Sequence, residues 1–256
     1  QAIRFRNNIE KTWKMINSLL NANKQKQNFP LFFSVNDQKI TNEDEIANHF
    51  NEFFTTIGPK LAEKITDSGK PPISSYLTQT ITTRFNFTNV QQKDVLEIIN
   101  GFDTKTSTGH DRLSMKLIKL IANKLSTPLC LIINQSLFSG IFPNKLKIAK
   151  VIPLHKKDEN TIFDNYRPIS LLPVLSKIFE RIVYNQVYKY FTNNNLFYVS
   201  QHGFRKLHST QTASLEYIDR TLTLLDSNKL PLSIFIDLSK AFDTINHDIL
   251  IQKLQY

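Results

Sequence analysis

Apolar side chains recur every three or four residues along several stretches of the chain, which is the period of a helix with one buried face. The clearest stretch runs through Leu175, Ile178, Phe179, Ile182 and Val183. The same spacing predicts helices over residues 2–22, 89–100, 111–124, 126–139, 174–192 and 209–226.

One more helix is predicted to begin at Thr41, where Thr41-x-x-Asp44 resembles a loose capping box. It should end near Gly58-Pro59, because glycine and proline both disfavour a continuing helix. Residues 67–80 combine glycine, paired prolines and several Ser/Thr residues, so we interpret them as a linker or domain boundary.

Short apolar and partly β-branched runs predict strands instead. They cover Leu31 to Val35 with a turn at Asn36-Asp37, Ile148 to Leu154, and Leu232 to Ile236. The last run is mostly apolar on both faces, so we expect a buried strand that ends at Asp237. Together the elements predict a helix-rich α/β or α+β fold.

Composition narrows the class of protein. The chain has 256 residues, of which 41% are hydrophobic, so it can bury a core. The single cysteine, Cys130, excludes an intramolecular disulfide and a cysteine zinc cluster. The six glycines stand too far apart for either common nucleotide-binding loop. No run of eighteen apolar residues occurs, so we expect no membrane span and an intracellular protein, in the nucleus or the cytoplasm.

Positive charge is concentrated in the middle of the chain. The formal net charge is +10, and residues 101–190, with 14 basic and 6 acidic side chains, hold +8 of it. A local cationic surface attracts polyanions, above all nucleic acid, and Lys145, Lys147 and Lys150 are the candidate contacts. The alternative is the solvated face of an ordinary basic protein.

Asp237 is the candidate for metal chemistry. A carboxylate at the end of a buried strand needs an ion pair, hydrogen bonds or a metal, and Mg²⁺ accepts one or two carboxylates together with substrate phosphates. The alternative is that Asp237 caps the next helix and Asp243 makes a surface ion pair.

Two other segments carry candidate binding groups. Lys156 and Lys157 follow a predicted strand and Arg167 precedes a proline, so these cations could hold a triphosphate or could form an ordinary charged hairpin tip. Arg205 stands beside glycine and phenylalanine in Gln201-His202-Gly203-Phe204-Arg205, which suits stacking on a nucleotide or a glycine turn with a core phenylalanine. The spacing of the histidines indicates no metal site.

Five ordered blocks resemble one protein family. They are residues 105–119 (KTSTGHDRLSMKLIK), 142–157 (FPNKLKIAKVIPLHKK), 165–182 (NYRPISLLPVLSKIFERI), 201–213 (QHGFRKLHSTQTA) and 235–250 (FIDLSKAFDTINHDIL). The set resembles the reverse transcriptases of non-LTR retrotransposons of the jockey or LINE type. The resemblance covers roughly residues 85–256, and residues 1–84 resemble the linker that precedes the polymerase in such proteins.

The resemblance implies roles for single residues. Asp237 matches the first metal-binding aspartate of the palm, and Leu238 would offer its backbone carbonyl to the second of two Mg²⁺ ions. Phe242 matches the aromatic gate against the ribose 2′-hydroxyl. Lys156 or Lys157, together with Arg167, would hold the incoming triphosphate, and Arg205 would lie near template or nucleotide.

The resemblance also implies a partial right-hand polymerase, namely fingers and the start of the palm preceded by a helical linker. Its partners would be an RNA template, a DNA primer and a dNTP. The family's aromatic-Ala-Asp-Asp turn has no counterpart, because the 256 residues contain no Asp-Asp pair. We therefore expect a fragment that is inactive alone. The alternative is a non-catalytic nucleic-acid-binding remnant of a retrotransposon.

Overall fold

The computed structural model describes residues 15–16, 29–35, 38–63, 69, 71, 73–76, 83–238 and 240–255. The predicted turn at Asn36-Asp37, most of the predicted helix over 2–22 and most of the linker at 67–80 therefore lie outside the described residues.

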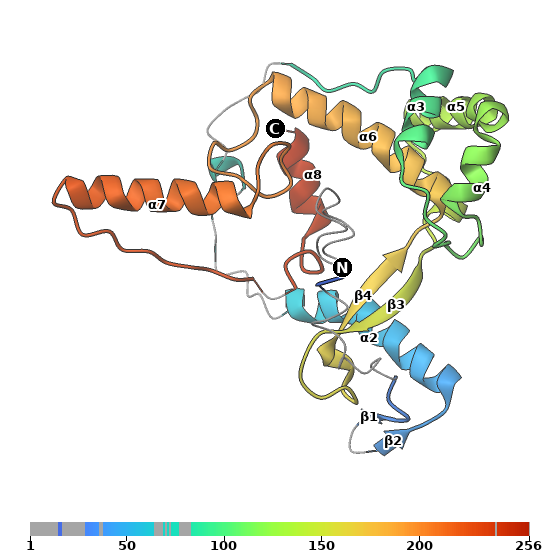
Figure 1. The fold of residues 1–256 in the computed structure, drawn as a ribbon, viewed down its shortest axis with the longest axis horizontal. Helices are drawn as coiled ribbons and strands as arrows, with labels where there is room; N and C mark the ends of the chain where they lie inside the picture. The colour runs from blue at the N-terminus through green and yellow to red at the C-terminus, as the bar shows by residue number, and fades with distance from the viewer. Residues whose placement is uncertain are drawn as a thin grey trace. The chain divides into compact units, whose positions relative to one another are not determined.

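The described residues form helices and four short strands (Figure 1). The α-helices are α2 (Glu43–Glu63), α3 (Gln92–Gly101), α4 (Met115–Leu120), α5 (Ala122–Ser139), α6 (Val174–Asn193), α7 (Thr210–Asp226) and α8 (His247–Gln255). The 3-10 helices are η2 (Ile73–Tyr76), η3 (Asn144–Leu146) and η4 (Phe163–Asn165). The strands are β1 (Phe33–Val35), β2 (Gln38–Ile40), β3 (Lys150–His155) and β4 (Tyr166–Leu171).

The chain divides into two compact units, which we describe separately. The first unit contains residues 1–54 and 153–168, and the second contains residues 55–152 and 169–256. The described strands make two sheets of two strands each, β1 with β2 and β3 with β4. The predicted helix-rich α/β class is thus confirmed in its coarse form.

The core of the first unit is aromatic. In the antiparallel pair β1–β2, Phe33 lies opposite Ile40, and Phe33 is fully buried. Its ring centroid lies 5.1 Å from that of Phe50 in α2 and 4.7 Å from that of Phe163 in η4. Residues more than a hundred positions apart in the sequence therefore share one core.

The core of the second unit is built by α3, α4, α5 and the N-terminal half of α6 (Figure 1). Its buried side chains follow helical spacing, as with Val95 and Ile99 in α3 and Ile178 and Ile182 in α6. Gly109 packs against the residues that lead into α6, and a Cβ there would lie 2.8 Å from the Pro173 nitrogen. The close approach of the chain to Pro173 therefore explains why residue 109 is glycine.

Most predicted helices are confirmed, and α2 shows an error at each end. Its N-terminal cap is Asn42, whose side-chain oxygen accepts from the Glu45 amide at 3.0 Å, so the predicted cap at Thr41 is wrong. The helix also continues through Pro59 to Glu63. Gly58 is buried, and a Cβ there would meet the Asp243 backbone, so this turn of α2 has room only for glycine. Pro59 removes one backbone donor, and the helix nevertheless continues.

The buried strand predicted over 232–236 is wrong. Residues 229–238 have no regular secondary structure, and Leu232, Ile234, Phe235 and Ile236 are each at least 79% exposed. No strand among the described residues pairs with this segment, and without a partner strand the backbone cannot form a ladder.

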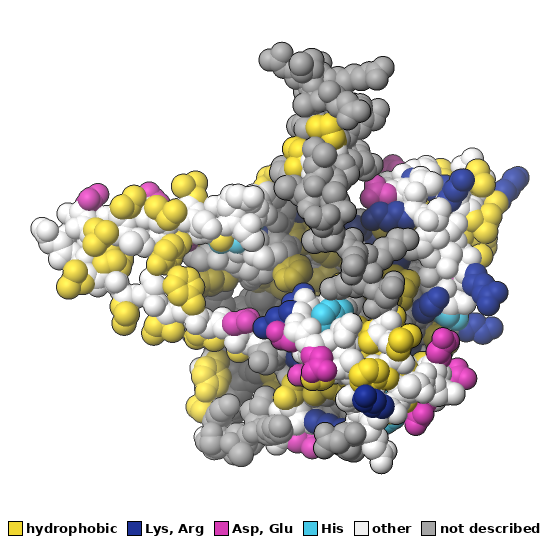
Figure 2. Space-filling view, turned by 60° about the horizontal axis from the view of Figure 1, so that its bottom comes forward, with side chains coloured by type: hydrophobic (Ala, Val, Ile, Leu, Met, Phe, Trp, Pro, Cys, Tyr) yellow, Lys and Arg dark blue, Asp and Glu magenta, His cyan; other side chains and the backbone are white. Residues whose placement is uncertain are grey.

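The same segment runs back beside α7 (Figure 1), where the Tyr217 hydroxyl lies 2.8 Å from the Ser233 hydroxyl. The Tyr217 and Phe235 ring centroids lie 5.8 Å apart. Figure 2 shows hydrophobic side chains open to solvent along both α7 and this segment, and Leu215 and Leu222 of α7 are among those that are exposed. The apolar side chains from which burial was predicted therefore lie on the surface of the protein.

Candidate nucleotide and nucleic-acid site

The loop between β3 and β4 carries the first group of predicted nucleotide contacts. The Lys156 amide donates to the Asn165 carbonyl at 2.8 Å and closes the loop. Inside it, the Tyr166 hydroxyl donates to the Asn160 carbonyl at 2.7 Å, and burial raises the pKa of that hydroxyl. The loop is therefore an ordered turn held by its own hydrogen bonds.

The two lysines of this loop and Arg167 of β4 are open to solvent. Lys156, Lys157 and Arg167 are all exposed. Lys157 has one weak partner, the Asp158 carboxylate at 3.9 Å, and both side chains of that pair are more than 60% exposed. Exposed and weakly paired cations are able to bind an anion, so the predicted triphosphate contacts fit their surroundings and remain predictions.

The N-terminal hairpin supports the same loop. The Ser34 amide of β1 donates to the Thr161 carbonyl at 3.0 Å, and Phe163 and Tyr166 pack in the aromatic core with Phe33. No pattern in the sequence indicates this pairing, because it joins positions more than a hundred residues apart. The loop that carries the candidate cations thus depends on residues 29–54 for its shape.

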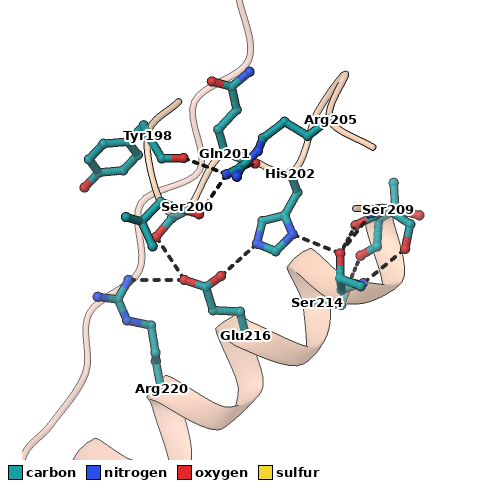
Figure 3. Close-up of polar contacts among 12 residues, drawn as sticks. Tyr198, Ser200, Gln201, His202, Arg205, Ser209, Ser214, Glu216 and Arg220 are labelled. Carbon is teal, nitrogen blue, oxygen red and sulfur yellow. Dashed lines mark hydrogen bonds and ion pairs between the residues drawn. The ribbon is translucent and has the colours of Figure 1, made fainter. Parts of the chain in front are cut away.

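Arg205 lies in a corner of the second unit, where backbone carbonyls surround its side chain (Figure 3). One guanidinium nitrogen donates to the carbonyls of Tyr198, Val199 and Gln201 at 3.0, 3.3 and 3.2 Å. The guanidinium carbon also lies 5.3 Å from the Phe197 ring centroid. Arg205 therefore has a structural role in closing the turn over 198–205, and its contact with nucleotide remains a prediction.

The same corner contains a hydrogen-bonded side-chain pair that the sequence analysis missed (Figure 3). His202 Nε2 lies 2.8 Å from the Glu216 carboxylate, and His202 Nδ1 lies 2.9 Å from the Thr212 hydroxyl. Ser200 donates to the other Glu216 oxygen at 2.9 Å. The hydrogen bond from His202, followed by that from Ser200, lowers the pKa of Glu216. Thr212 and Glu216 are four residues apart on α7, so both lie on the same face of the helix. This spacing is the sequence signal that could have indicated their shared contact with His202.

The Glu216 pair predicts a pH dependence of stability. A carboxyl whose pKa is lower in the folded state stabilises the fold above its ordinary pKa of 4.5, and this stabilisation is lost as the pH falls through the folded value. Glu216→Gln should therefore reduce the loss of thermal stability on acidification below about pH 4.5. The exposed Asp219→Asn on the same helix is the control. An unchanged pH profile in Glu216→Gln would contradict the pair.

Phe204 and Phe242 bring two of the sequence blocks together. Their ring centroids lie 6.0 Å apart with the planes at 89°. The rings are 85% and 74% exposed, so Phe204 is not the core phenylalanine that one interpretation expected. Phe204 also has a φ of +60°, a left-handed conformation that is uncommon outside glycine. Phe242, the predicted gate, is thus paired with an exposed aromatic from the Gly-Phe-Arg block.

Asp237 is exposed in the segment that lacks secondary structure, so its predicted position at the end of a buried strand is wrong. Leu238 beside it is 68% exposed. Within the part of the chain that the structure describes, no group of three or more His, Cys, Asp or Glu side chains is placed to hold a metal ion. Asp237 and the Leu238 carbonyl supply only two donors, whereas Mg²⁺ takes an octahedral set. These residues alone do not form a magnesium site.

Lys145, Lys147 and Lys150 are all exposed around η3 and the start of β3. Lys147 Nζ donates to the Asn144 side chain at 3.0 Å, which leaves its charge unneutralised. The His110 ring contacts the Ile148 carbonyl at 3.1 Å and ties this segment to the loop before α4. The three lysines therefore place positive charge on a segment that the His110 contact fixes, as the predicted nucleic-acid contact requires.

Comparison with known proteins identifies the class. Residues 154–256 match the family described as reverse transcriptase (RNA-dependent DNA polymerase). The match includes Lys156, Arg167, Arg205, Asp237 and Phe242. Of the described helices, none is long and apolar enough to cross a membrane.

Curated relatives come from mobile elements. The chain is 30% identical over 216 residues to the "Probable RNA-directed DNA polymerase from transposon BS" of Drosophila melanogaster, covering 84% of this chain and 24% of the relative. It is 30% identical over 182 residues to the "RNA-directed DNA polymerase from mobile element jockey" of the same species, covering 71% and 20%. It is 28% identical over 173 residues to the "Probable RNA-directed DNA polymerase from transposon X-element", covering 67% and 19%.

The chain therefore contains a reverse transcriptase domain with distant similarity to the enzymes of non-LTR retrotransposons. This confirms the resemblance carried by the five sequence blocks. The chain spans about a quarter or less of the length of these relatives.

Proposed function

We propose that this chain is part of an RNA-directed DNA polymerase of a non-LTR retrotransposon, acting inside the cell on an RNA template, a DNA primer and dNTPs. The observation that carries the proposal is the family match over residues 154–256. In this proposal residues 85–256 are the N-terminal part of the polymerase, with fingers and the first palm motif, and residues 1–84 are the region that precedes it.

The proposed reaction is nucleotidyl transfer. The primer 3′-hydroxyl attacks the α-phosphorus of the dNTP, a new phosphodiester bond forms, and pyrophosphate leaves with the electron pair of the broken bond. Lys156 or Lys157, together with Arg167, would neutralise the triphosphate, because these exposed cations lie on or beside one ordered loop. Phe242 would lie against the sugar of the dNTP.

Mg²⁺ is the proposed cofactor of the complete enzyme. Two ions would activate the 3′-hydroxyl and stabilise the leaving group. Asp237 and the Leu238 carbonyl would contribute donors to that site, with further carboxylates from elsewhere in the protein. Because the 256 residues contain no Asp-Asp pair, we propose that the chain by itself does not polymerise.

RNA-templated incorporation of dNTPs tests the proposed function. A protein as long as the relatives should incorporate dNTPs on an RNA template, and the 256-residue chain should not. Incorporation by the 256-residue chain would contradict the proposed dependence on further carboxylates. Absence of incorporation by the full-length protein would contradict the polymerase itself.

RNA binding by the basic segment gives a second prediction. Removing one phosphate contact to a single strand reduces the slope of log affinity against log salt by about 0.7. Neutralising Lys145, Lys147 and Lys150 together should therefore lower the slope by about 2. Fluorescence anisotropy with a labelled RNA at several salt concentrations measures it. The matched control neutralises three exposed lysines elsewhere, Lys93, Lys116 and Lys253. An equal slope change in the control would contradict a local contact.

The alternative is a nucleic-acid-binding remnant without catalysis. One observation favours it: Asp237 lies in an exposed segment that has no partner strand among the described residues. The open reading frame beyond Tyr256 separates the two. A downstream Tyr-Ala-Asp-Asp-like block supports the enzyme, and a stop codon supports the remnant.

A further inference from the structure

Seven side chains of the second unit form a continuous row of aromatic rings and cations, which we call the α6 ladder. Three of them lie on α6, three lie in the segment between α6 and α7, and one directly follows α3. They are Phe102, Arg181, Tyr184, Tyr188, Phe197, Arg205 and Lys206.

One end of the ladder is centred on Arg181. Its guanidinium carbon lies 5.7 Å from the Phe102 ring centroid and 5.6 Å from that of Tyr184. The Tyr184 ring in turn lies 5.3 Å from that of Tyr188 at an interplanar angle of 33°. Arg181, Tyr184 and Tyr188 follow a three- and four-residue spacing, so one face of α6 presents all three.

The other end is built by the loop after α6. The Phe197 ring centroid lies 5.2 Å from that of Tyr188, and the Arg205 guanidinium lies over Phe197. Lys206 Nζ lies 5.2 Å from the Tyr188 ring centroid, and the Lys206 amide donates to the Tyr188 hydroxyl at 2.9 Å. Each ring of the row therefore has a cation or another ring beside it.

The cations of the ladder outnumber the acidic side chains of its helix. Arg181, Arg205 and Lys206 belong to the ladder, α6 also carries Lys177 and Lys189, and the one acidic residue of α6 is Glu180. Arg181 and Lys206 are exposed, and Tyr184 is 39% exposed. The ladder thus offers accessible ring surface together with positive charge. An apolar protein partner would use only the ring surface, whereas a nucleic acid would use both.

We propose that the α6 ladder is a binding surface for single-stranded RNA. Unpaired bases stack on aromatic rings regardless of sequence, while arginine and lysine neutralise the adjacent phosphates. From Arg181 to Tyr188 the helix rises about 10 Å, which matches roughly three nucleotides at about 3.4 Å each. A duplex hides its base faces and would make only the charge contacts.

This surface deepens the proposed function, because it assigns a place for unpaired template, and it rests on that function for its biological role. Its residues are distinct from Lys145, Lys147 and Lys150 and from the loop cations. Binding of RNA by the ladder can therefore be measured on the 256-residue chain, whether or not that chain polymerises.

The test is anisotropy with a labelled single-stranded RNA of about ten nucleotides. Tyr184→Ala should weaken binding about ten-fold at every salt concentration, because it removes stacking and leaves the charges in place. Tyr184→Phe keeps the ring and should restore affinity to within about two-fold. Arg181→Gln should instead lower the salt slope by about 0.7, the change expected when one phosphate contact is removed.

Phe138→Ala is the matched control, since Phe138 is a helical aromatic that is 90% exposed and lies outside the ladder. Unchanged affinity in Tyr184→Ala, an unchanged slope in Arg181→Gln, or equal competition by a polyglutamate peptide would overturn the proposal. Normal RNA binding through the ladder in a full-length protein that fails to polymerise would contradict only the proposed function. Polymerisation that depends on Asp237, with RNA affinity indifferent to Tyr184, would contradict only the ladder.

Discussion

Asp237→Asn in the full-length protein is expected to lower RNA-templated dNTP incorporation by at least about 100-fold. The reason is that a metal ion contributes several kcal/mol of transition-state stabilisation, and each 1.36 kcal/mol is about ten-fold in rate. Asparagine keeps the size of the side chain and removes its negative charge. Incorporation of labelled dTTP on an oligo(dT)-primed poly(rA) template measures the effect.

The control for this prediction is Asp226→Asn, which neutralises the exposed last residue of α7 and should leave incorporation unchanged. RNA affinity should be equal in both variants and in the unchanged protein. If Asp237→Asn polymerised at the normal rate, Asp237 would be no metal ligand and the remnant interpretation would be favoured. A parallel loss in Asp226→Asn would indicate a general effect of charge.

Phe33→Ala is expected to destabilise the first unit by about 3–5 kcal/mol, the usual range for removing a buried phenylalanine. Phe33 is fully buried and contacts the rings of Phe50, Phe163 and Tyr166. Urea unfolding measures the change. Hydrogen exchange should be faster at the Lys156 amide, because the core that supports its loop is removed.

The neighbouring Leu31→Ala is the control, because Leu31 is 89% exposed and its truncation should change the free energy of unfolding by no more than about 0.5 kcal/mol. If both variants had the same stability, the aromatic core would not hold the loop. Faster exchange at Lys156 in Leu31→Ala alone would contradict the described contact between the hairpin and the loop.

Helices with a self-contained pattern could be predicted from the sequence. The apolar stripe of α6 at Ile178, Phe179 and Ile182 is buried as expected, and its start at Val174 agrees with the prediction. The capping residue Ser209 begins α7 one position before its first helical residue. Local spacing decided both helices, so local reasoning was sufficient.

Features that depend on distant partners could not be predicted in this way. The run at 232–236 has the composition of a buried strand, but a strand forms only beside another strand. The end of α2 was misplaced because Gly58 and Pro59 have the pattern of a stop signal, whereas the helix continues through both to Glu63. The support of the loop by Phe33 joins residues too far apart for any periodicity to reveal.

The residues of the candidate site show the same difference between local sequence signals and contacts with distant residues. Sequence blocks pointed to Lys156, Arg167 and Asp237, and the family match includes all three. The structure adds Glu216 and Tyr184, and it pairs Phe204 of the Gly-Phe-Arg block with Phe242. Glu216 and Tyr184 act through neighbours that lie on other segments, so their pairing becomes visible only after the chain folds.

The open segment beside α7 has a consequence for handling this protein. No backbone hydrogen bond joins residues 230–238 to another described segment, and the run over 232–236 is uncharged and apolar apart from Ser233. Exposed segments with unpaired backbone groups and apolar, β-branched side chains can pair between molecules and lead to aggregation. The region that carries the candidate catalytic carboxylate is therefore also the region where concentrated solutions of this chain would first self-associate.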